Sequence, residues 1–266
     1  MPVRMKVSVI IATLNEAQAM GACLQSVHAA GATPEIIVVD GGSTDATVAI
    51  AREGGAVVLR SPAGRGMQFN VGARYATGDV LVFLHADTLL PENAFLMLQQ
   101  KFSDPRVQAG TFRMKFSSSY SLLRLYAYFT RFDSVFTSFG DQGIAIRRSF
   151  LNAIGGFPEW PLFEDVCLLQ KARKRVRVHS FPATVTTSAR RFLTNGILRQ
   201  QIRNAVYLLL YLLGAPPAQL ARMYCRSNRS PSNASRLRPK PSDEDTSLRK
   251  KVTEKTVGSI RASSGF

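Results

Sequence analysis

Short aliphatic runs alternate with helix-like segments over the first hundred residues, and few folds accommodate such an alternation. Gly31, Gly54 and Gly78 follow the helix-like segments, where glycine commonly ends a helix. Strands and helices in this order form βα units, in which helices cover both faces of a parallel sheet. We predict strands at residues 7–12, 35–40, 56–59 and 80–84, and helices at 17–29, 44–53 and 67–76. The sequence therefore predicts an α/β fold with a Rossmann-like, doubly wound sheet.

The pattern changes after residue 105. Residues 110–116 alternate apolar and polar side chains, which is typical of an antiparallel strand. Further strands are predicted at 143–146 and 176–181, and helices at 122–130 and 163–174. We therefore expect a parallel half, residues 5–105, followed by a half of mixed β and α structure, residues 106–194.

A C-terminal helical segment is expected at residues 195–224, with its main helix at 195–213. That helix begins with arginines and glutamines and ends in an aliphatic and tyrosine-containing run that is too short to span a bilayer. Either it packs on the domain or on a second copy in a homodimer, or it lies in a membrane interface with its arginines at the headgroups. Residues 225–266 are rich in Ser, Arg, Lys and Pro, which predicts a disordered basic tail.

The chain has 266 residues and a formal net charge of +16. A basic excess of this size favours contact with phosphate groups of nucleic acid, anionic lipid or a nucleotide, and charge alone does not choose among them. Three cysteines without a CxxC spacing predict neither a disulfide framework nor a cysteine zinc site. The apolar run at 7–12 is a buried strand rather than a signal peptide. We expect a cytoplasmic protein that could sit peripherally on the inner face of the cell membrane.

Polar residues follow three of the predicted parallel strands at the point where each strand ends. Strand ends and helix N-termini open into one crevice at the carboxyl edge of such a sheet, and ligands bind there. Ser43 or Thr44 could also simply cap the next helix. The candidate ligand-binding residues are Thr13, Asn15 and Glu16 after the first strand, Asp40, Ser43 and Asp45 around the second, and His85, Ala86 and Asp87 after the fourth.

A metal site is predicted at His85-Ala86-Asp87. Residues two apart at the end of a strand can reach the same point, and a carboxylate oxygen suits Mg²⁺ or Mn²⁺. A cation there would neutralise a diphosphate. Arg65, which lies between Gly64 and Gly66, is the basic residue that we expect to meet the same diphosphate.

Glu164 and Asp165 begin the predicted helix at 163–174, after a glycine turn and an aromatic stretch. Acidic residues are favoured in the first turn of a helix by its dipole, which is sufficient to explain the pair without any function. A carboxylate in an apolar-walled cleft can also take a proton from an attacking hydroxyl group. We predict Asp165 as a catalytic base, with Glu164 beside it in the substrate site.

Together these motifs resemble family 2 of the inverting glycosyltransferases. The resemblance covers residues 5–224, and the order of its motifs is specific. They are residues 7–16, residues 38–45, the Gly78-Asp79-Val80 segment leading to His85-Ala86-Asp87, and Gly155-Gly156-Phe157 followed by Glu164-Asp165.

The resemblance implies a GT-A fold, with residues 5–105 as the nucleotide-sugar half and 106–194 as the acceptor half. It implies that Asp40 and the residues around Thr13 and Glu16 hold the nucleotide of a UDP- or GDP-linked sugar. It also implies that Asp87 binds Mn²⁺ or Mg²⁺ and that Asp165 is the base. Two departures are His85, where the family's DxD motif has an acid, and Ala12-Thr13, where a proline is common.

The chain is most similar to a bacterial subgroup with this HAD variant and a Gly140-Asp141-Gln142-Gly143 segment, which places Gln142 near the acceptor. It has no QxxRW motif, so a non-processive, single transfer is favoured. We expect an acceptor hydroxyl on a lipid-linked or membrane-associated molecule, and no nucleic acid.

Two alternatives remain. A sugar nucleotidyltransferase would need a Gly-rich, basic loop after the first strand, and Asn15-Glu16-Ala17-Gln18 does not supply one. A non-catalytic basic protein that binds membrane or nucleic acid, with a vestigial glycosyltransferase fold, would show salt-sensitive phosphate contacts.

Overall fold

The computed structural model describes residues 5–31 and 33–227. The chain divides into two compact units, residues 1–221 and 222–266, and every site discussed below lies in the first. The strands are β1 (Val7–Thr13), β2 (Glu35–Asp40), β3 (Val57–Arg60), β4 (Val80–His85), β5 (Thr88–Leu89), β6 (Ala109–Phe116), β7 (Ile144–Arg147) and β8 (His179–Thr187).

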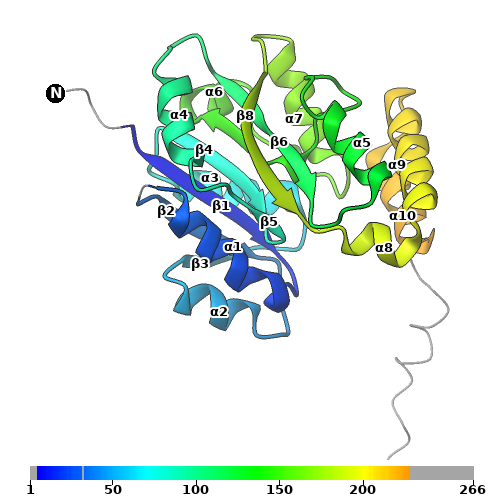
Figure 1. Cartoon of the computed structure of the whole chain (residues 1–266), viewed down its shortest axis with the longest axis horizontal. Coiled ribbons are helices and arrows are strands. Elements are labelled where there is room, and N and C mark those ends of the chain that lie inside the picture. The colour runs from blue at the N-terminus through cyan, green and yellow to red at the C-terminus, as the bar shows by residue number, and fades with distance from the viewer. Residues whose placement is uncertain (1–4, 32, 228–266) are drawn as a thin grey trace, which may run out of the picture. The chain divides into compact units, whose positions relative to one another are not determined.

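Helices surround these strands (Figure 1). They are α1 (Ala17–Ala29), α2 (Thr47–Glu53), α3 (Arg65–Tyr75), α4 (Ala94–Phe102), α5 (Ser121–Phe129), the short 3-10 helix η1 (Gly140–Gln142), α6 (Arg148–Ala153), α7 (Glu164–Arg173), α8 (Arg190–Asn195), α9 (Ile197–Leu212) and α10 (Pro217–Ser227). None of the helices in the described ranges is both long and apolar enough to cross a membrane.

All the strands belong to one eight-stranded sheet with the order β3-β2-β1-β4-β7-β6-β8-β5. Strands β1, β2, β3 and β4 are parallel to one another, whereas β5 pairs antiparallel with β8 at the other end of the sheet. The chain moves outward from β1 to β2 and β3, and then returns to the other side of β1 to place β4. Such a reversal leaves a crevice beyond the carboxyl ends of β1 and β4, which is where polar residues follow both strands.

Side chains of the parallel strands alternate between two hydrophobic cores, because successive residues of a strand point to opposite faces. Val9 and Ile11 of β1 join α1, α2, α4 and the buried sides of α5 and α8. Ile10 and Ala12 join α3, α6 and α7 on the other face. Burial on both faces explains why these strands are continuous aliphatic runs, and it confirms the predicted α/β fold.

The strands of the second half depart from the predictions in three ways. β6 is antiparallel to β7, as expected, but it is parallel to β8 on its other side. The predicted strand at 176–181 begins later, at His179, because the N–H groups of Arg175 and Val176 bond to Ala172 and close α7. It also continues past Pro182, because a register shift opposite Phe112 and Arg113 spares the proline from donating to the ladder.

The helix predicted at 195–213 is confirmed as α9, and the short helix α8, which was not predicted, ends just before it. Gly196 has a φ of +83°, a left-handed conformation that ends α8 and starts α9. Residues 225–227 of the predicted tail are helical, as the end of α10. Residues 228–266 lie outside the described residues, so the disorder expected for the tail stays a prediction there.

Candidate active site

The loop after β2 is organised by Asp40. This carboxylate is 1% exposed and accepts hydrogen bonds of 3.1 Å from the backbone N–H groups of Gly42 and Ser43. Gly42 has a φ of +100°, which a residue with a Cβ would adopt only with strain. The Asp40-Gly41-Gly42 sequence therefore builds a tight turn at the carboxyl end of β2.

The loops after β1 and β2 are fastened to each other by side chains. The Asn15 N–H donates to Ser43 Oγ at 2.8 Å, and Asn15 Oδ1 accepts the Thr44 N–H at 2.8 Å. Asn15 adopts a left-handed φ of 54°, which asparagine tolerates well. The predicted capping of α2 by Ser43 or Thr44 is wrong, because α2 starts later, after Ala46, and both residues bond across to Asn15 instead.

Asp45 and Glu16 hold neighbouring parts of this edge. Asp45 Oδ1 accepts the Thr47 N–H at 3.0 Å, and its other oxygen accepts the Ala17 N–H at 3.2 Å. The side-chain hydrogen bond from Thr47 is the main cause of the lowered pKa of Asp45. The Glu16 carboxylate is bound through both oxygens, at 3.0 Å each, by Arg190 of α8. The structure thus brings α8 to the end of β1.

A buried glutamine that sequence reasoning missed joins the ends of β1 and β2. Gln68 of α3 is 3% exposed, and its Nε2 donates to the carbonyl oxygens of Thr13 at 2.8 Å and Val39 at 2.7 Å. The signal in the sequence was a lone polar residue on the face of a helix that also carries Phe69. It fixes the backbone from which Thr13 and Asp40 project.

His85, at the end of β4, turns toward η1. Its Nδ1 lies 2.9 Å from Oδ1 of Asp141, and its ring is stacked on Phe69 with centroids 6.1 Å apart. Its Nε2 is buried and has no hydrogen-bond partner among the described residues. Sequence reasoning placed the Gly140-Asp141-Gln142-Gly143 segment near the acceptor but did not select Asp141 itself.

Charge around Asp141 favours its ionised form. Half of its side-chain surface is exposed, yet the surrounding protein still desolvates the carboxylate, which opposes ionisation. The hydrogen bond and charge of His85, with the charges of Arg65 and Arg191, outweigh this cost and lower the pKa of Asp141. Asp141 is therefore a charged partner that orients the imidazole of His85.

Asp165 lies beside His85 at the start of α7 and is 7% exposed. Its Oδ2 accepts the Gly140 N–H at 2.5 Å, and its Oδ1 accepts the N–H of Val166 at 2.8 Å. A Cβ on Gly140 would lie 2.9 Å from Asp165 Oδ2 and 3.2 Å from His85 Nε2. Any Cβ at this position would force one of these two side chains to move, because the end of β4, η1 and the start of α7 meet here.

Arg65 and Glu164 form an ion pair next to Asp165. Arg65 Nε lies 2.6 Å from Glu164 Oε1, and the glutamate side chain is 1% exposed. Burial raises the pKa of Glu164, the Arg65 charge opposes this shift, and the Asp165 charge adds to it. A Cβ on Gly66 would lie 2.2 Å from the Pro158 carbonyl oxygen, which explains the glycine after Arg65. The predicted Arg65 therefore reaches the same site as the predicted base.

Asp87 follows β4 and is half-buried, and its carboxylate forms no hydrogen bond or ion pair with any described residue. Burial, and to a smaller extent the charge of Asp87, raises the pKa of Cys23 in α1 to about 12. No group of three His, Cys, Asp or Glu in the described part of the chain could hold a metal by itself. A single free carboxylate nevertheless fits Mg²⁺ or Mn²⁺ that shares its other positions with water and phosphate oxygens.

The two remaining predicted residues, Ala86 and Gln142, adjoin residues already described in this site. Ala86 is buried between His85 and Asp87. Gln142 of η1 is fully buried, and its Nε2 donates to the Thr137 carbonyl oxygen. Its Oε1 has no hydrogen-bond partner among the described residues. Gln142 thus supports the loop that carries Gly140.

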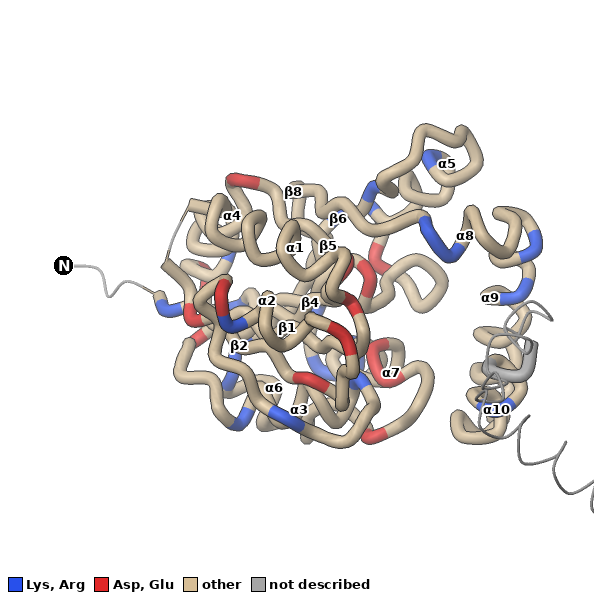
Figure 2. The backbone as a smooth tube through the Cα atoms, turned by 90° about the horizontal axis from the view of Figure 1, so that it is seen from below, with Lys and Arg blue, Asp and Glu red and all other residues tan. Residues whose placement is uncertain are grey.

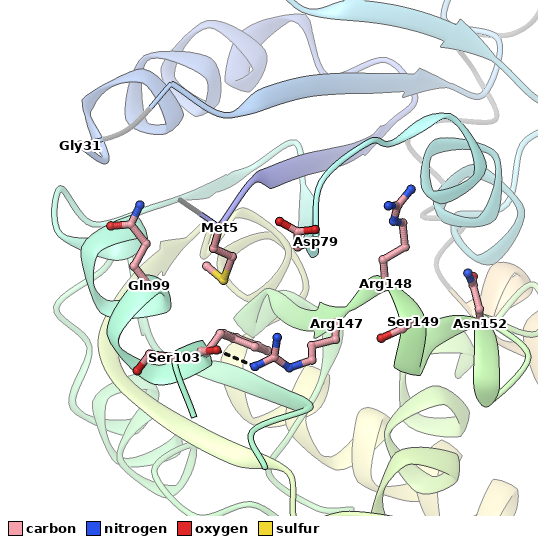
Figure 3. Close-up of a pocket in the computed structure, with 10 residues that line it drawn as sticks. Met5, Gly31, Asp79, Gln99, Ser103, Arg147, Arg148, Ser149 and Asn152 are labelled. Atoms are coloured by element: carbon pink, nitrogen blue, oxygen red, sulfur yellow. Dashed lines mark hydrogen bonds between the residues drawn. The ribbon is translucent and has the colours of Figure 1, made fainter. Parts of the chain in front are cut away.

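A pocket lies at the opposite edge of the sheet, before β1 and β4. It has a volume of about 1070 Å³ and is lined by Met5, Asp79, Arg147 and Arg148, among others (Figure 3). Both arginines are engaged with backbone, Arg147 with the carbonyl oxygens of residues 102, 104 and 107 and Arg148 with that of residue 76. The candidate site residues are all at the other edge.

Comparison with known structures gives the same fold at low identity. TarS residues 1–349 from S. aureus, in complex with UDP-GlcNAc, is 22% identical with a TM-score of 0.55 over 69% of this chain and 58% of that one. The mannosyltransferase PcManGT from Pyrobaculum calidifontis, in complex with GDP-Man and Mn²⁺, is 21% identical with a TM-score of 0.54, over 89% and 79%. Glucosyl-3-phosphoglycerate synthase from Mycobacterium tuberculosis, with Mn²⁺, UDP and glucosyl-3-phosphoglycerate, is 20% identical with a TM-score of 0.57, over 80% and 81%.

No curated protein matches the chain. The sequence model described as Glycosyl transferase family 2 matches residues 8–153, which is more than half of the chain. That range contains the loops after β1, β2 and β4 as well as Gly140, and the predicted resemblance to this family is confirmed at the level of the family. The chain is a glycosyltransferase and belongs to glycosyl transferase family 2.

Proposed function

We propose that this protein is an inverting, non-processive glycosyltransferase that uses a UDP- or GDP-linked sugar, with Asp165 as the catalytic base. The observation that carries the proposal is the position of Asp165. Its carboxylate is held by the Gly140 N–H, beside His85 and the Arg65–Glu164 pair, at the switch point between β1 and β4. Hydrogen bonds to backbone fix a base in place, so it loses little freedom when a substrate arrives.

The reaction is a single displacement. The acceptor hydroxyl oxygen bonds to the anomeric carbon and gives its proton to Asp165. The bond between that carbon and the diphosphate oxygen breaks at the same time, and its electron pair leaves with the diphosphate. The new bond forms on the opposite face of the sugar, so its configuration inverts and no covalent enzyme intermediate forms.

Residues of the three strand ends would hold the donor. Asp40, Thr13 and Asn15 would face the nucleoside, while the neighbouring Glu16, Ser43 and Asp45 shape the loop that encloses it. Arg65 would contact the diphosphate, with His85 and Ala86 alongside. A divalent cation, Mn²⁺ or Mg²⁺, held by Asp87, would supply positive charge to the diphosphate leaving group. Solved structures of similar fold that contain Mn²⁺ and a nucleotide or nucleotide sugar support a divalent cation as the cofactor.

We propose an acceptor hydroxyl on a lipid-linked or membrane-associated molecule, at the cytoplasmic face of the membrane, rather than on nucleic acid. The support is the outer face of α9. Leu198, Ile202, Val206, Leu209 and Leu213 recur every three or four residues and are all exposed. The inner face of the same helix is anchored by Tyr211, whose ring stacks on Phe163 with centroids 4.8 Å apart. An anchored helix with an aliphatic outer face suits a lipid interface or a homodimer.

The anomeric configuration of the released sugar tests the mechanism without knowledge of the acceptor. Water can replace the acceptor, and NMR spectroscopy can follow slow hydrolysis of UDP-glucose or GDP-mannose before mutarotation. The proposal expects the inverted anomer to appear first, and Asp165→Asn to lose this hydrolysis. Initial release of the retained anomer would contradict a single displacement. Release of a nucleoside triphosphate from the donor and pyrophosphate would favour a nucleotidyltransferase instead.

A further inference from the structure

An apolar surface covers the outside of α5 and the loop that follows it. Leu125 is 54% exposed, and Phe132 and Phe136 are 58% and 63% exposed. We call this surface the α5 ridge, and it consists of Leu122, Leu125, Tyr128, Phe129, Phe132 and Phe136. Leu123 and Thr130, on the inner side, are buried, and the Thr130 hydroxyl accepts the N–H of Met114 at 3.1 Å. The segment is thus fixed to β6 while its largest side chains face outward.

A basic groove runs along one side of the α5 ridge. It has a volume of about 560 Å³ between β6 and α5, and four basic side chains and no acidic ones line it. These are Arg113, Lys115, Arg124 and Arg131. Arg113 Nε is buried without a hydrogen-bond partner among the described residues. The Arg131 guanidinium lies over the Tyr128 ring, 4.4 Å from its centroid, which ties the groove to the ridge.

We propose that the α5 ridge and this groove form a docking site for an anionic lipid surface, in which the groove takes a phosphate headgroup and the ridge enters the interface. Four cations that share one cavity are compensated best by an anion, and arginine suits phosphate oxygens. A free phosphate ion would leave the large apolar side chains of the α5 ridge exposed to water, whereas a lipid would cover them. Their burial in the interface contributes hydrophobic free energy, while the cations are attracted to acidic headgroups.

A second copy of the chain fits this surface less well. A twofold dimer places the same patch on both subunits, so two basic grooves would face each other. The wider charge distribution also favours a membrane. Residues 166–242 contain no Asp or Glu. Figure 2 shows acidic positions around the ends of β1 and β4 and the start of α7, whereas α5, α8 and α9 carry basic positions only.

The docking site is connected to the candidate active site. The loop after α5 leads directly to η1, where the Gly140 N–H holds Asp165. Phe116 packs against Tyr126 of α5 and Phe192 of α8, with ring centroids 5.8 and 5.1 Å apart. Both views place α5, α8 and α9 at one end of the first unit, away from β2 (Figures 1 and 2). The inference that docking delivers an acceptor rests on the proposed function. The inference that the site binds an anionic lipid surface does not depend on it.

Sedimentation with vesicles tests the site on the full chain. Vesicles of phosphatidylcholine, with and without phosphatidylglycerol, are the probe, and the partition coefficient is the measured quantity. Arg124→Glu with Arg131→Glu reverses two groove charges, and Arg52→Glu with Lys101→Glu reverses two exposed charges on α2 and α4 as a matched control. We expect a loss of about tenfold or more for the groove pair and a much smaller loss for the control pair. Equal losses would overturn the site in favour of diffuse attraction.

The ridge has its own matched pair. Leu125→Ser is compared with Leu96→Ser on α4, since the two leucines are 54% and 58% exposed. We expect only Leu125→Ser to weaken binding to the anionic vesicles. No binding by the wild type, or equal binding to neutral vesicles, would overturn the proposal. A wild-type dimer that Leu125→Ser converts to a monomer, measured by light scattering, would assign the ridge to a second copy.

Titration of the groove variants with UDP and GDP separates this inference from the proposed function. The groove variants should bind nucleotide as the wild type does, because no groove residue belongs to the strand-end site. Nucleotide binding without specific lipid binding would refute the docking site alone. Lipid binding without any nucleotide binding would refute the proposed function alone. Thermal unfolding of each variant checks that it is folded.

Discussion

The strand-end loops differ from helices α5 and α9 in where their side chains find contacts. The loops after β1 and β2 are closed by internal partners, as when Asn15 bonds to Ser43 and Thr44 or Gln68 to Thr13 and Val39. On α5 and α9 the large side chains of Leu125 and Ile202 face solvent instead. A region closed by its own contacts is ready to bind a small ligand. Large exposed apolar surfaces commonly mark interaction sites, and we propose a lipid surface for the one on α5.

Asp165→Asn should give the largest effect, because it removes only the base from the closed region. General-base catalysis contributes about 10² to 10⁴ in rate, so transfer or donor hydrolysis should fall by that factor. UDP or GDP affinity should stay within about twofold, since Asp165 would contact the acceptor and not the nucleotide. Glu159→Gln, an exposed acid before the same helix, is the control and should leave the rate unchanged. A rate loss of similar size in both variants would contradict the assignment of Asp165 as the catalytic base.

Gly140→Ala tests whether close packing sets the position of the base. The added Cβ would meet Asp165 Oδ2 at 2.9 Å and His85 Nε2 at 3.2 Å, so one of them must move. We expect kcat to fall by about tenfold or more, and the free energy of unfolding by about 1–3 kcal/mol. Gly21→Ala in α1 is the matched control, because its Cβ would meet only Ile50 at 3.9 Å. Unchanged kcat in Gly140→Ala would mean that the Asp165 position is not restrictive.

Gln68→Ala should destabilise the closed region without touching the chemistry directly. It leaves the buried carbonyl oxygens of Thr13 and Val39 without their side-chain donor. We expect a loss of about 1–3 kcal/mol in the free energy of unfolding, measured by urea denaturation, with weaker nucleotide binding. Gln18→Ala, at an exposed position of α1, should change neither quantity. A Gln68→Ala protein as stable as the wild type would show that these internal hydrogen bonds do not stabilise the strand-end loops.

Ile202→Ser should have the smallest effect, because the outer face of α9 is exposed among the described residues. Ile202 is 63% exposed, and its replacement should change the free energy of unfolding by less than about 0.5 kcal/mol. Leu208→Ser, on the buried face of the same helix, should cost about 2 kcal/mol or more. Equal costs in urea denaturation would show that the outer face is already covered in solution.

The sequence carried more information about the first half than about the second. Strands such as Ile36–Val39 are buried on both faces, so their composition alone identified them and placed Asp40 at a strand end. The continuation of β8 past Pro182 could not be predicted, because the bulge that accommodates the proline depends on pairing with β6. Asp141 and Arg190 were missed for the same reason, since their partners His85 and Glu16 are distant in the sequence. The ion pair of Arg65 with Glu164 likewise needed the fold.

Calorimetric titration with UDP and GDP, in the presence and absence of Mn²⁺, tests whether the ends of β1, β2 and β4 form a metal-dependent donor site. The wild type is compared with Asp87→Ala, and with Glu92→Ala as an exposed acidic control. We expect one nucleotide to bind in a metal-dependent way, and Asp87→Ala to lose this dependence while Glu92→Ala keeps it. If neither nucleotide bound the wild type, with or without metal, the site at the ends of β1, β2 and β4 would not be a donor site.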